Sequence, residues 1–289
     1  MDSGVNTKES PTQKAEAKQN FNIELIDFGE AYIRLKRAFA ERKIVITGGR
    51  AVNLHTNADT RRSSDVDVIV DMYAGELEGF AKLAQYEGFS VDDTYNREKG
   101  APGIRLVDNK TKIKFDVYHR GMAPLSGIPV KEILDSAVKV TRNVALLEET
   151  TGSSQLNLDV ASPVITSLMK FNTWIERGEK ATPKNKDAID FIDIMGDQYG
   201  HDLDAFIRNS EPALSKYING GAIKKPFVLS GEQPQSIHSV REFRMEVIKM
   251  YIKLDKVGKL KEVSPEDIVA AQSELDYEES VKSFQRTRR

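Results

Sequence analysis

The chain has 289 residues, a length that accommodates one large domain or two of ordinary size, and two is the expectation. Its 42 basic and 44 acidic side chains give a net charge of -2, so contact with nucleic acid or an anionic membrane would have to come from local basic patches. The absence of cysteine excludes disulfides, thiolate zinc sites and cysteine nucleophiles, and only four histidines argue against a histidine-rich metal site.

The sequence shows no targeting or membrane signal. No apolar run approaches the roughly 20 residues that a membrane-spanning helix needs. The segment from Met1 to Asn6 lacks the basic and apolar regions of a signal peptide. We therefore expect a cytoplasmic protein without a membrane partner.

The first half of the chain has the pattern of a small α/β unit. Residues 1–20 contain almost no large apolar side chain, which predicts a disordered tail, and helical apolar spacing over 23–42 predicts an amphipathic helix. Strands are expected at 44–47, 65–70, 103–107 and 112–118, with a short helix after Gly48-Gly49, a polar loop at 57–64, and a helix over 74–87 that Asp71 caps. The last two strands flank a hairpin turn at 108–110, and a charged loop covers 92–102. The order of elements indicates a mixed sheet.

The second half of the chain is expected to be mainly helical. A short helix at 131–138, a strand at 144–147 and a turn at 152–154 precede it. Helices are then expected from Ser162-Pro163 nearly to 218, with a second start at Thr182-Pro183, and again around 240–254 and 264–284 after a linker-like loop at 220–234.

The fold class that follows is α/β (α+β): a small mixed-sheet domain followed by a mainly helical C-terminal domain. The expected division is a disordered tail at 1–20, a catalytic domain at 21–135, a helical domain at 136–225, and a linker with C-terminal helices at 226–289.

Two aspartates one residue apart open the second strand. Asp65 and Asp67 share one face of the strand, while Val66 and Val68 face the core. Two like charges this close repel each other and need a cation, and hard divalent ions prefer one or two carboxylates together with substrate phosphates. The pair predicts a metal-nucleotide site; the alternative is a pair that caps a turn or faces water.

Gly48 and Gly49 lie between a strand and a helix. Glycine permits a phosphate to approach the backbone, and the helix N-terminus offers amide donors and the positive end of a dipole. A tight turn without a ligand is the alternative. Arg50 either contacts phosphate or metal or faces water, and Ser64 either binds phosphate or caps the strand entry.

Asp116 adds a carboxylate on the polar face of a later strand, between Phe115 and Val117. If its hairpin lies beside the Asp65 strand, three carboxylates converge on one edge of the sheet. Such a set can hold two divalent ions about 4 Å apart, the arrangement that stabilises the attacking and leaving oxygens of nucleotidyl transfer. Arg105, in the preceding strand, is expected to reach the same face or to form a surface ion pair.

Gly48-Gly49, Asp65-Val66-Asp67 and Asp116 together resemble the signature of the polymerase-beta-like nucleotidyltransferase superfamily. The fifteen-residue spacer between the glycines and Asp65, with Arg61 and Ser63 at its end, is most similar to the branch of AbiEii-type nucleotidyltransferase toxins. The resemblance covers roughly residues 44 to 195.

Two further motifs carry the resemblance beyond the sheet. Members of the branch have a lysine on a helix after the sheet, which Lys170 matches, and a basic-Lys-Asp segment on the next helix, which Lys186-Asp187 matches. The family usually has an arginine before Lys-Asp, whereas the nearby basic residue here is Lys184, which weakens a bidentate phosphate clamp.

The resemblance implies Mg²⁺ or Mn²⁺ as cofactor and a nucleoside triphosphate (NTP) as substrate. The implied metal ligands are Asp65, Asp67 and Asp116; the catalytic set adds Lys170 and Asp187; the nucleotide-binding set is Gly48, Gly49, Arg50, Ser64, Lys170 and Lys186. The two lysines would act as point charges on phosphates, and Asp187, with Asp190 three residues on, would orient a lysine or accept a proton. A solvated, salt-bridged helix face is the alternative.

These observations predict a magnesium-dependent nucleotidyltransferase that moves a nucleoside monophosphate to an acceptor hydroxyl and releases pyrophosphate, with the nucleotide in a cleft between two domains. The resemblance implies RNA, tRNA in particular, as acceptor and an antitoxin-like protein as partner. A catalytically inactive nucleotide-binding or partner-docking protein on the same fold is the main alternative. A small-molecule nucleotidyltransferase of the antibiotic-modifying kind is a third.

Overall fold

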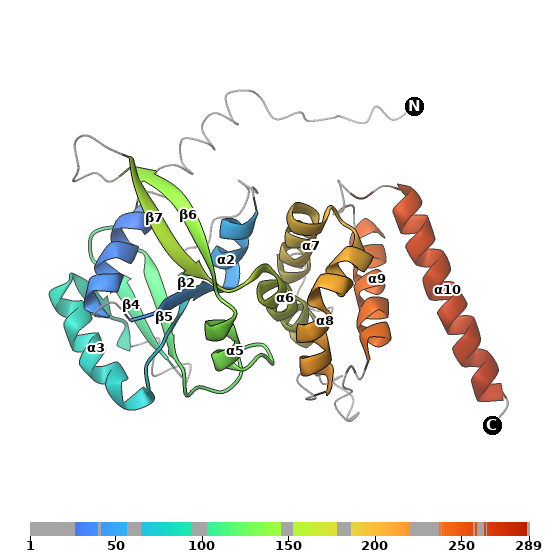
Figure 1. Ribbon diagram of the computed structural model, residues 1–289, viewed down its shortest axis with the longest axis horizontal. Helices are drawn as coiled ribbons and strands as arrows, with labels where there is room; N and C mark the ends of the chain where they lie inside the picture. Colours follow the sequence, from blue (N-terminus) through green and yellow to red (C-terminus); the bar gives the residue numbers. More distant parts are fainter. Residues whose placement is uncertain are drawn as a thin grey trace. The chain divides into compact units, whose positions relative to one another are not determined.

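The computed structural model describes two compact units of the chain (Figure 1). The described residues are 27–39, 42–56, 65–93, 103–145, 153–177, 186–219, 237, 239–256, 258, 263 and 265–287. The first unit comprises Met1–Ala123 and Val130–Ser162, and the second comprises Pro124–Pro129 and Pro163–Arg289. The predictions for 1–20, for 57–64 with Arg61, Ser63 and Ser64, for Thr182-Pro183 with Lys184, and for 220–234 fall outside the described residues.

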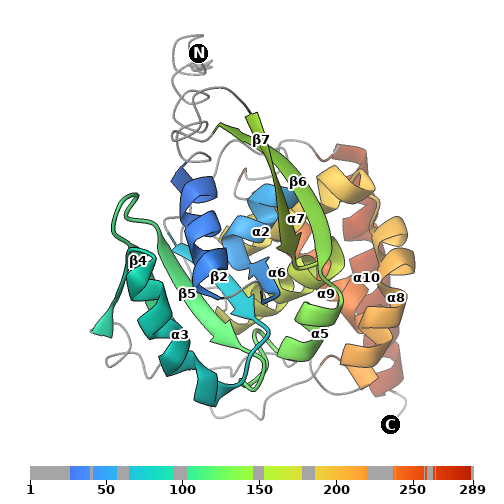
Figure 2. The ribbon, with the colours of Figure 1, turned by 60° about the vertical axis from the view of Figure 1, so that its left-hand side comes forward.

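A mixed β-sheet forms the centre of the first unit (Figure 2). Its strands are β1 (Ile44–Thr47), β2 (Asp65–Val70), β3 (Phe89–Val91), β4 (Ile104–Asp108), β5 (Lys114–His119), β6 (Val138–Ala145) and β7 (Ser153–Val160). Their spatial order is β3-β4-β5-β2-β1-β7-β6. β2 runs parallel to β5 and antiparallel to β1, β1 is parallel to β7, and the remaining neighbours are antiparallel. The predicted mixed α/β fold class is confirmed.

One face of this sheet is apolar and packs against helices. Val66 and Val68 of β2 lie in a buried cluster with side chains of β5 and of the helix at 27–38. The ring of Phe39, just after that helix, stacks on Phe80 of α3 (Ala74–Tyr86) with centroids 5.3 Å apart, and the two helices lie side by side in Figures 1 and 2. Two shorter helices, α2 (Gly48–His55) and α5 (Val130–Asp135), complete the unit. The period-two alternation of β2 therefore separates a core face from a polar face.

The cap of α3 differs from the prediction. Tyr73 is the N-cap residue, and its backbone N–H donates to Glu76 Oε2 at 2.8 Å. The carboxylate of Asp71, which was expected to cap the helix, forms an ion pair with Arg120 at 2.8 Å. The prediction was wrong because Arg120, the residue after β5, binds the carboxylate of Asp71 instead.

The hairpin of β6 and β7 is longer than the single strand at 144–147 that the sequence suggested. Its two strands belong to the first unit, whereas the sequence division begins a helical domain at residue 136. Leu156, Leu158 and Val160 alternate along β7 and pack in or against the sheet's core cluster, which is the signal that the interpretation missed. The three-residue strand β3 was also missed.

The second unit is helical and is built around aromatic side chains. Its helices are α6 (Pro163–Arg177), α7 (Lys186–Tyr199), α8 (Leu203–Asn219), α9 (Val240–Lys256) and α10 (Pro265–Thr287). Phe171 of α6 lies within ring-contact distance of Phe191 of α7 and Phe243 of α9, with centroids 5.8 and 4.7 Å apart. Among the residues described, no helix has the length and apolar character that crossing a bilayer requires.

A buried ion pair ties the first helix of the described chain to the sheet. Arg34 donates from Nε to Asp108 Oδ1 at 2.9 Å and from Nη2 to Oδ2 at 2.8 Å. Thr111 also donates to Asp108 through its backbone N–H and its hydroxyl. Burial alone would raise the pKa of Asp108, but the hydrogen bonds from Arg34 and Thr111 outweigh it and hold the pKa below its usual value.

Because the folded-state pKa of Asp108 is below its unfolded value, its stabilising contribution is complete above the unfolded pKa and disappears as pH falls through the folded pKa. Asp108→Asn should therefore lower the free energy of unfolding by about 1.5–3 kcal/mol at pH 7, with a smaller difference in acid. Urea unfolding between pH 7 and pH 3 measures this. A deficit that stays constant over that range would contradict the assignment, and exposed Asp135→Asn is the control.

Candidate active site

Polar side chains form a row across the non-core face of the sheet. Thr47 of β1 is opposite Asp67 of β2, Asp67 is opposite Asp116 of β5, and Asp116 is opposite Arg105 of β4. Residues directly opposite each other project to the same face, so the four form one line perpendicular to the strands. Asp65 lies two residues from Asp67 on the same face. The expected placement of the hairpin beside the Asp65 strand is therefore correct.

The glycine at the start of α2 lies directly against Asp67. Gly48 has a φ of +63°, and a Cβ built on it would lie 2.0 Å from Asp67 Oδ2. A Cβ there would require the side chain of Asp67 to shift, and the left-handed backbone also favours glycine. The carboxylate of Asp67 therefore lies beside the N-terminus of α2. A helix N-terminus favours anions, and the first turn of α2 contains no acidic side chain of its own. Gly49 is buried in the same turn.

Arg50, the next residue of α2, is directed into the protein. It is buried, and its guanidinium carbon lies 5.0 Å from the centre of the Phe28 ring. This cation–π contact fastens α2 to the helix at 27–38. The packing favours a structural contribution from Arg50 alongside its predicted contact with nucleotide.

Arg105 binds two of the three aspartates. It donates from Nε to Asp116 Oδ1 at 2.6 Å and from Nη2 to Asp116 Oδ2 at 2.8 Å, a bidentate pair, and Nη2 lies 3.4 Å from Asp65 Oδ2. Tyr118 donates its hydroxyl to Asp67 Oδ1 at 3.3 Å. The sequence interpretation left open whether Arg105 reaches this face or forms a surface ion pair, and the structure places it on this face. The alternation of the strand places Tyr118 on the face of Asp116, but no role was assigned to it.

The three carboxylates differ in access. The side chain of Asp65 is 41% exposed, whereas that of Asp116 is 9% exposed and has both oxygens bound to Arg105. Within the described ranges, no group of three or more Asp, Glu, His or Cys side chains is arranged to hold a metal ion. Asp65 is therefore more accessible to a ligand on this face than Asp116.

Two histidines of the first unit hydrogen-bond to the backbone. His55 Nε2 lies 2.6 Å from the carbonyl oxygen of Ala161. Burial, opposed by that hydrogen bond, lowers the pKa of His55. His119 Nδ1 accepts the backbone N–H of Gly121 at 3.2 Å, and burial lowers its pKa.

In the second unit, Lys170 of α6 forms a buried cluster with two aspartates of α7. Its Nζ lies 2.9 Å from Asp187 Oδ1 and 2.7 Å from Asp190 Oδ2. All three side chains are less than 10% exposed. The predicted pairing of a lysine with this aspartate face is present. Lys186 begins α7 and is exposed.

Comparison with known proteins gives distant structural likenesses. No family model matches the chain, and no curated protein matches it. The antibiotic-resistance factor ANT(2'')-Ia has a solution structure that matches with a TM-score of 0.41 and 10% identity, over 68% of this chain and 98% of that one. An antigenic nucleotidyltransferase-like protein from Paracoccidioides brasiliensis matches with a TM-score of 0.41 and 15% identity, over 67% of this chain and 92% of that one. Likeness at this level does not assign the chain to a family.

Substitution of Gly48 should be more damaging than the same change at another left-handed glycine. Gly48→Ala and Gly88→Ala both place a Cβ at positive φ, which costs about 1–2 kcal/mol. Only Gly48→Ala also drives the Cβ into Asp67, because nothing lies within 4 Å of Gly88. We expect the larger loss of unfolding free energy for Gly48→Ala in urea titrations.

The double variant Gly48→Ala with Asp67→Ala tests the contact itself. Removing the carboxylate removes the closest clash, so the double variant should be more stable than the sum of the single changes predicts. Additive losses would contradict a direct contact between Gly48 and Asp67.

Proposed function

We propose that the protein is a nucleotidyltransferase that moves a nucleoside monophosphate from an NTP to an acceptor hydroxyl and releases pyrophosphate. The observation that carries the proposal is the position of Asp67. Its carboxylate lies against Gly48, a glycine with left-handed backbone at the start of α2. Such a turn lets a phosphate approach backbone amides while a neighbouring carboxylate meets the counter-ion. The sequence motifs Gly48-Gly49 and Asp65-Val66-Asp67 meet at this point.

Two of the three aspartates fit as ligands of a hard divalent ion. Asp65 and Asp67 lie on one face at i, i+2, and two carboxylates together with triphosphate oxygens are a donor set that Mg²⁺ or Mn²⁺ accepts. The ion, when bound, would stabilise the attacking and leaving oxygens of the displacement. Asp116 fits less well because Arg105 occupies both of its oxygens.

The chain's own groups supply the rest of the proposed chemistry. Asp65 and Asp67 hold the counter-ion and through it orient the triphosphate, and the backbone N–H groups at the start of α2 donate hydrogen bonds to phosphate oxygens. Asp116, once released by Arg105, takes the proton of the acceptor hydroxyl. Lys170, Lys186 and Asp187 of the second unit remain proposed site residues on the order of their motifs. An RNA acceptor, tRNA in particular, an antitoxin-like partner and a cytoplasmic location rest on the sequence resemblance alone.

Asp67→Asn should reduce transfer to below about 1% of the wild-type rate, because it removes a charge that the triphosphate and its counter-ion need. The assay incubates the chain with each labelled NTP, Mg²⁺ and total RNA and follows labelled product. Asp135→Asn, which makes the same chemical change at an exposed position of α5, should retain full activity. Wild-type transfer by Asp67→Asn would contradict the proposed role of that carboxylate.

A catalytically inactive nucleotide-binding protein is the second candidate, and the Arg105–Asp116 pair favours it. The guanidinium of Arg105 occupies both oxygens of Asp116, so neither is open to an acceptor hydroxyl while the pair lasts. Nucleotide binding at Asp65 and Asp67 does not require Asp116 to be released. The two candidates therefore differ in what Asp116 does.

Transfer by the wild type separates the candidates, and Asp116→Asn tests the role of the carboxylate. In a transferase it should abolish transfer and keep nucleotide-induced thermal stabilisation in Mg²⁺; in a binding protein the wild type itself shows that stabilisation and no transfer. Thermal unfolding without nucleotide reports how much the lost pair with Arg105 destabilises the variant. Loss of nucleotide stabilisation in Asp116→Asn, with the fold retained, would contradict both assignments.

A further inference from the structure

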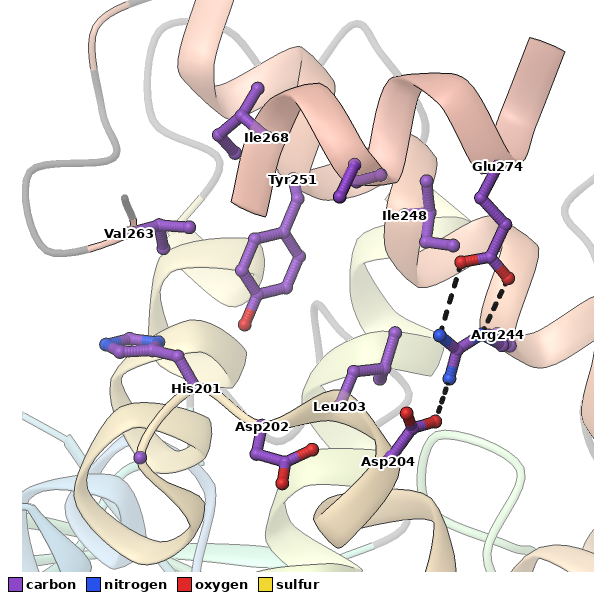
Figure 3. Close-up of a pocket in the computed structure, with 13 residues that line it drawn as sticks. His201, Asp202, Leu203, Asp204, Arg244, Ile248, Tyr251, Val263, Ile268 and Glu274 are labelled. Atoms are coloured by element: carbon purple, nitrogen blue, oxygen red, sulfur yellow. Dashed lines mark hydrogen bonds and ion pairs between the residues drawn. The ribbon is translucent and has the colours of Figure 1, made fainter. Parts of the chain in front are cut away.

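A cavity of about 460 Å³ opens in the second unit, among the turn before α8, α9 and α10 (Figure 3). This volume lies within the roughly 300–1,000 Å³ that small-molecule pockets occupy. Leu203, Ile248 and Ala271 give it an apolar wall, and the same three residues lie in or against a small apolar cluster of these helices. None of the residues proposed for nucleotide chemistry is among those that line it.

Tyr251 places an unsatisfied polar atom at this cavity. Its hydroxyl oxygen is buried and has no hydrogen-bond partner among the residues that the structure describes, and the residue is 7% exposed. In Figure 3 the ring extends from α9 with its hydroxyl end toward the side of the cavity that carries His201. Burial raises the pKa of Tyr251 above its usual range, so the hydroxyl stays neutral and can donate and accept. A buried hydroxyl without a partner is costly, and a polar ligand atom would satisfy it.

The opposite side of the cavity is acidic. Arg244 of α9 donates to Glu274 of α10 from Nε at 2.8 Å and from Nη2 at 3.2 Å, and its Nη1 is bonded to Asp204 of α8. Asp202 also lines the cavity and accepts the backbone N–H of Ala205. Asp202 also lies 3.9 Å from Arg208 of α8, which does not line the cavity, so the three lining carboxylates face one lining guanidinium, Arg244. Because that guanidinium is already clamped between two of them, the wall disfavours an anion and favours a cation.

We propose that this cavity binds a small organic amine. The apolar body of the ligand lies between Leu203, Ile248 and Ala271. Its ammonium group faces the carboxylates of Asp202, Asp204 and Glu274, and a second polar atom hydrogen-bonds to the hydroxyl of Tyr251. No lining residue of this cavity belongs to the site proposed for nucleotide transfer, and the ligand has a different chemistry.

Three probes that share one ring system and differ in charge test the ligand class. Tryptamine is a cation, tryptophol is neutral and indole-3-propionate is an anion. All three carry an indole N–H that can donate a hydrogen bond to the hydroxyl of Tyr251. Titrations of the full chain at low salt, followed by calorimetry or ligand-observed NMR, should rank tryptamine first, about tenfold tighter than tryptophol. Equal affinities, a preference for the anion, or no binding by any probe would overturn the proposal.

Variants then place the binding in the cavity. Tyr251→Phe removes only the hydroxyl, so it should weaken tryptamine about fivefold while the free variant melts at the same temperature or about 2–4 °C higher. Tyr199→Phe is the matched control, since Tyr199 packs on Phe206 and does not line the cavity. Asp204→Asn should weaken tryptamine and leave tryptophol unchanged. Unaltered tryptamine affinity in both Tyr251→Phe and Asp204→Asn would rule out this cavity.

Asp67→Asn separates this proposal from the nucleotide site. Because Asp67 belongs to the first unit and the cavity lies wholly in the second, the variant should bind tryptamine as the wild type does. Tryptamine affinity that falls with Asp67→Asn would mean that the probe binds at the nucleotide site, which would overturn the proposal.

Discussion

The register of β2 between its two neighbours is the constraint on which the candidate site depends. Pairing with β5 sets Asp67 opposite Asp116, and pairing with β1 sets Asp67 opposite Thr47, next to Gly48. A slip of one residue would turn both strand-face aspartates into the core and Val66 and Val68 out of it. Each buried valine is worth about 1.5–3 kcal/mol. The apolar face therefore fixes the register, and the register fixes the chemistry of the polar face.

Charge balance decides what that polar face can do. Arg105 binds both oxygens of Asp116 and approaches Asp65, so a single guanidinium faces the three carboxylates on this side of the sheet. A triphosphate with its counter-ion would change this balance, because a cation between Asp65 and Asp67 repels the guanidinium. Transfer and simple binding thus differ in one event, the release of Asp116 by Arg105. The sequence allows Arg105 to lie on this face but does not determine which carboxylate it binds.

The sequence predicts local features of this protein better than pairings. The strands Ile44–Thr47 and Asp65–Val70 and the helices after them follow from short-range apolar patterns, and the structure contains them. The neighbours of β1 depend on a strand more than 100 residues away, and no local pattern specifies that β7 pairs there. The cap of α3 was misjudged for a related reason: Asp71 is a good cap by type, but Arg120 of a distant segment binds it.

The two polar features of the second unit differ in whether they need a ligand. Lys170 is held by Asp187 and Asp190, so its charge has partners within the protein. These ion pairs fasten α6 to α7 whether or not a phosphate binds. The hydroxyl of Tyr251 has no such partner among the described residues. A buried group that the fold leaves unsatisfied beside a cavity is the stronger indication of a ligand, because binding removes a cost that the folded chain already carries.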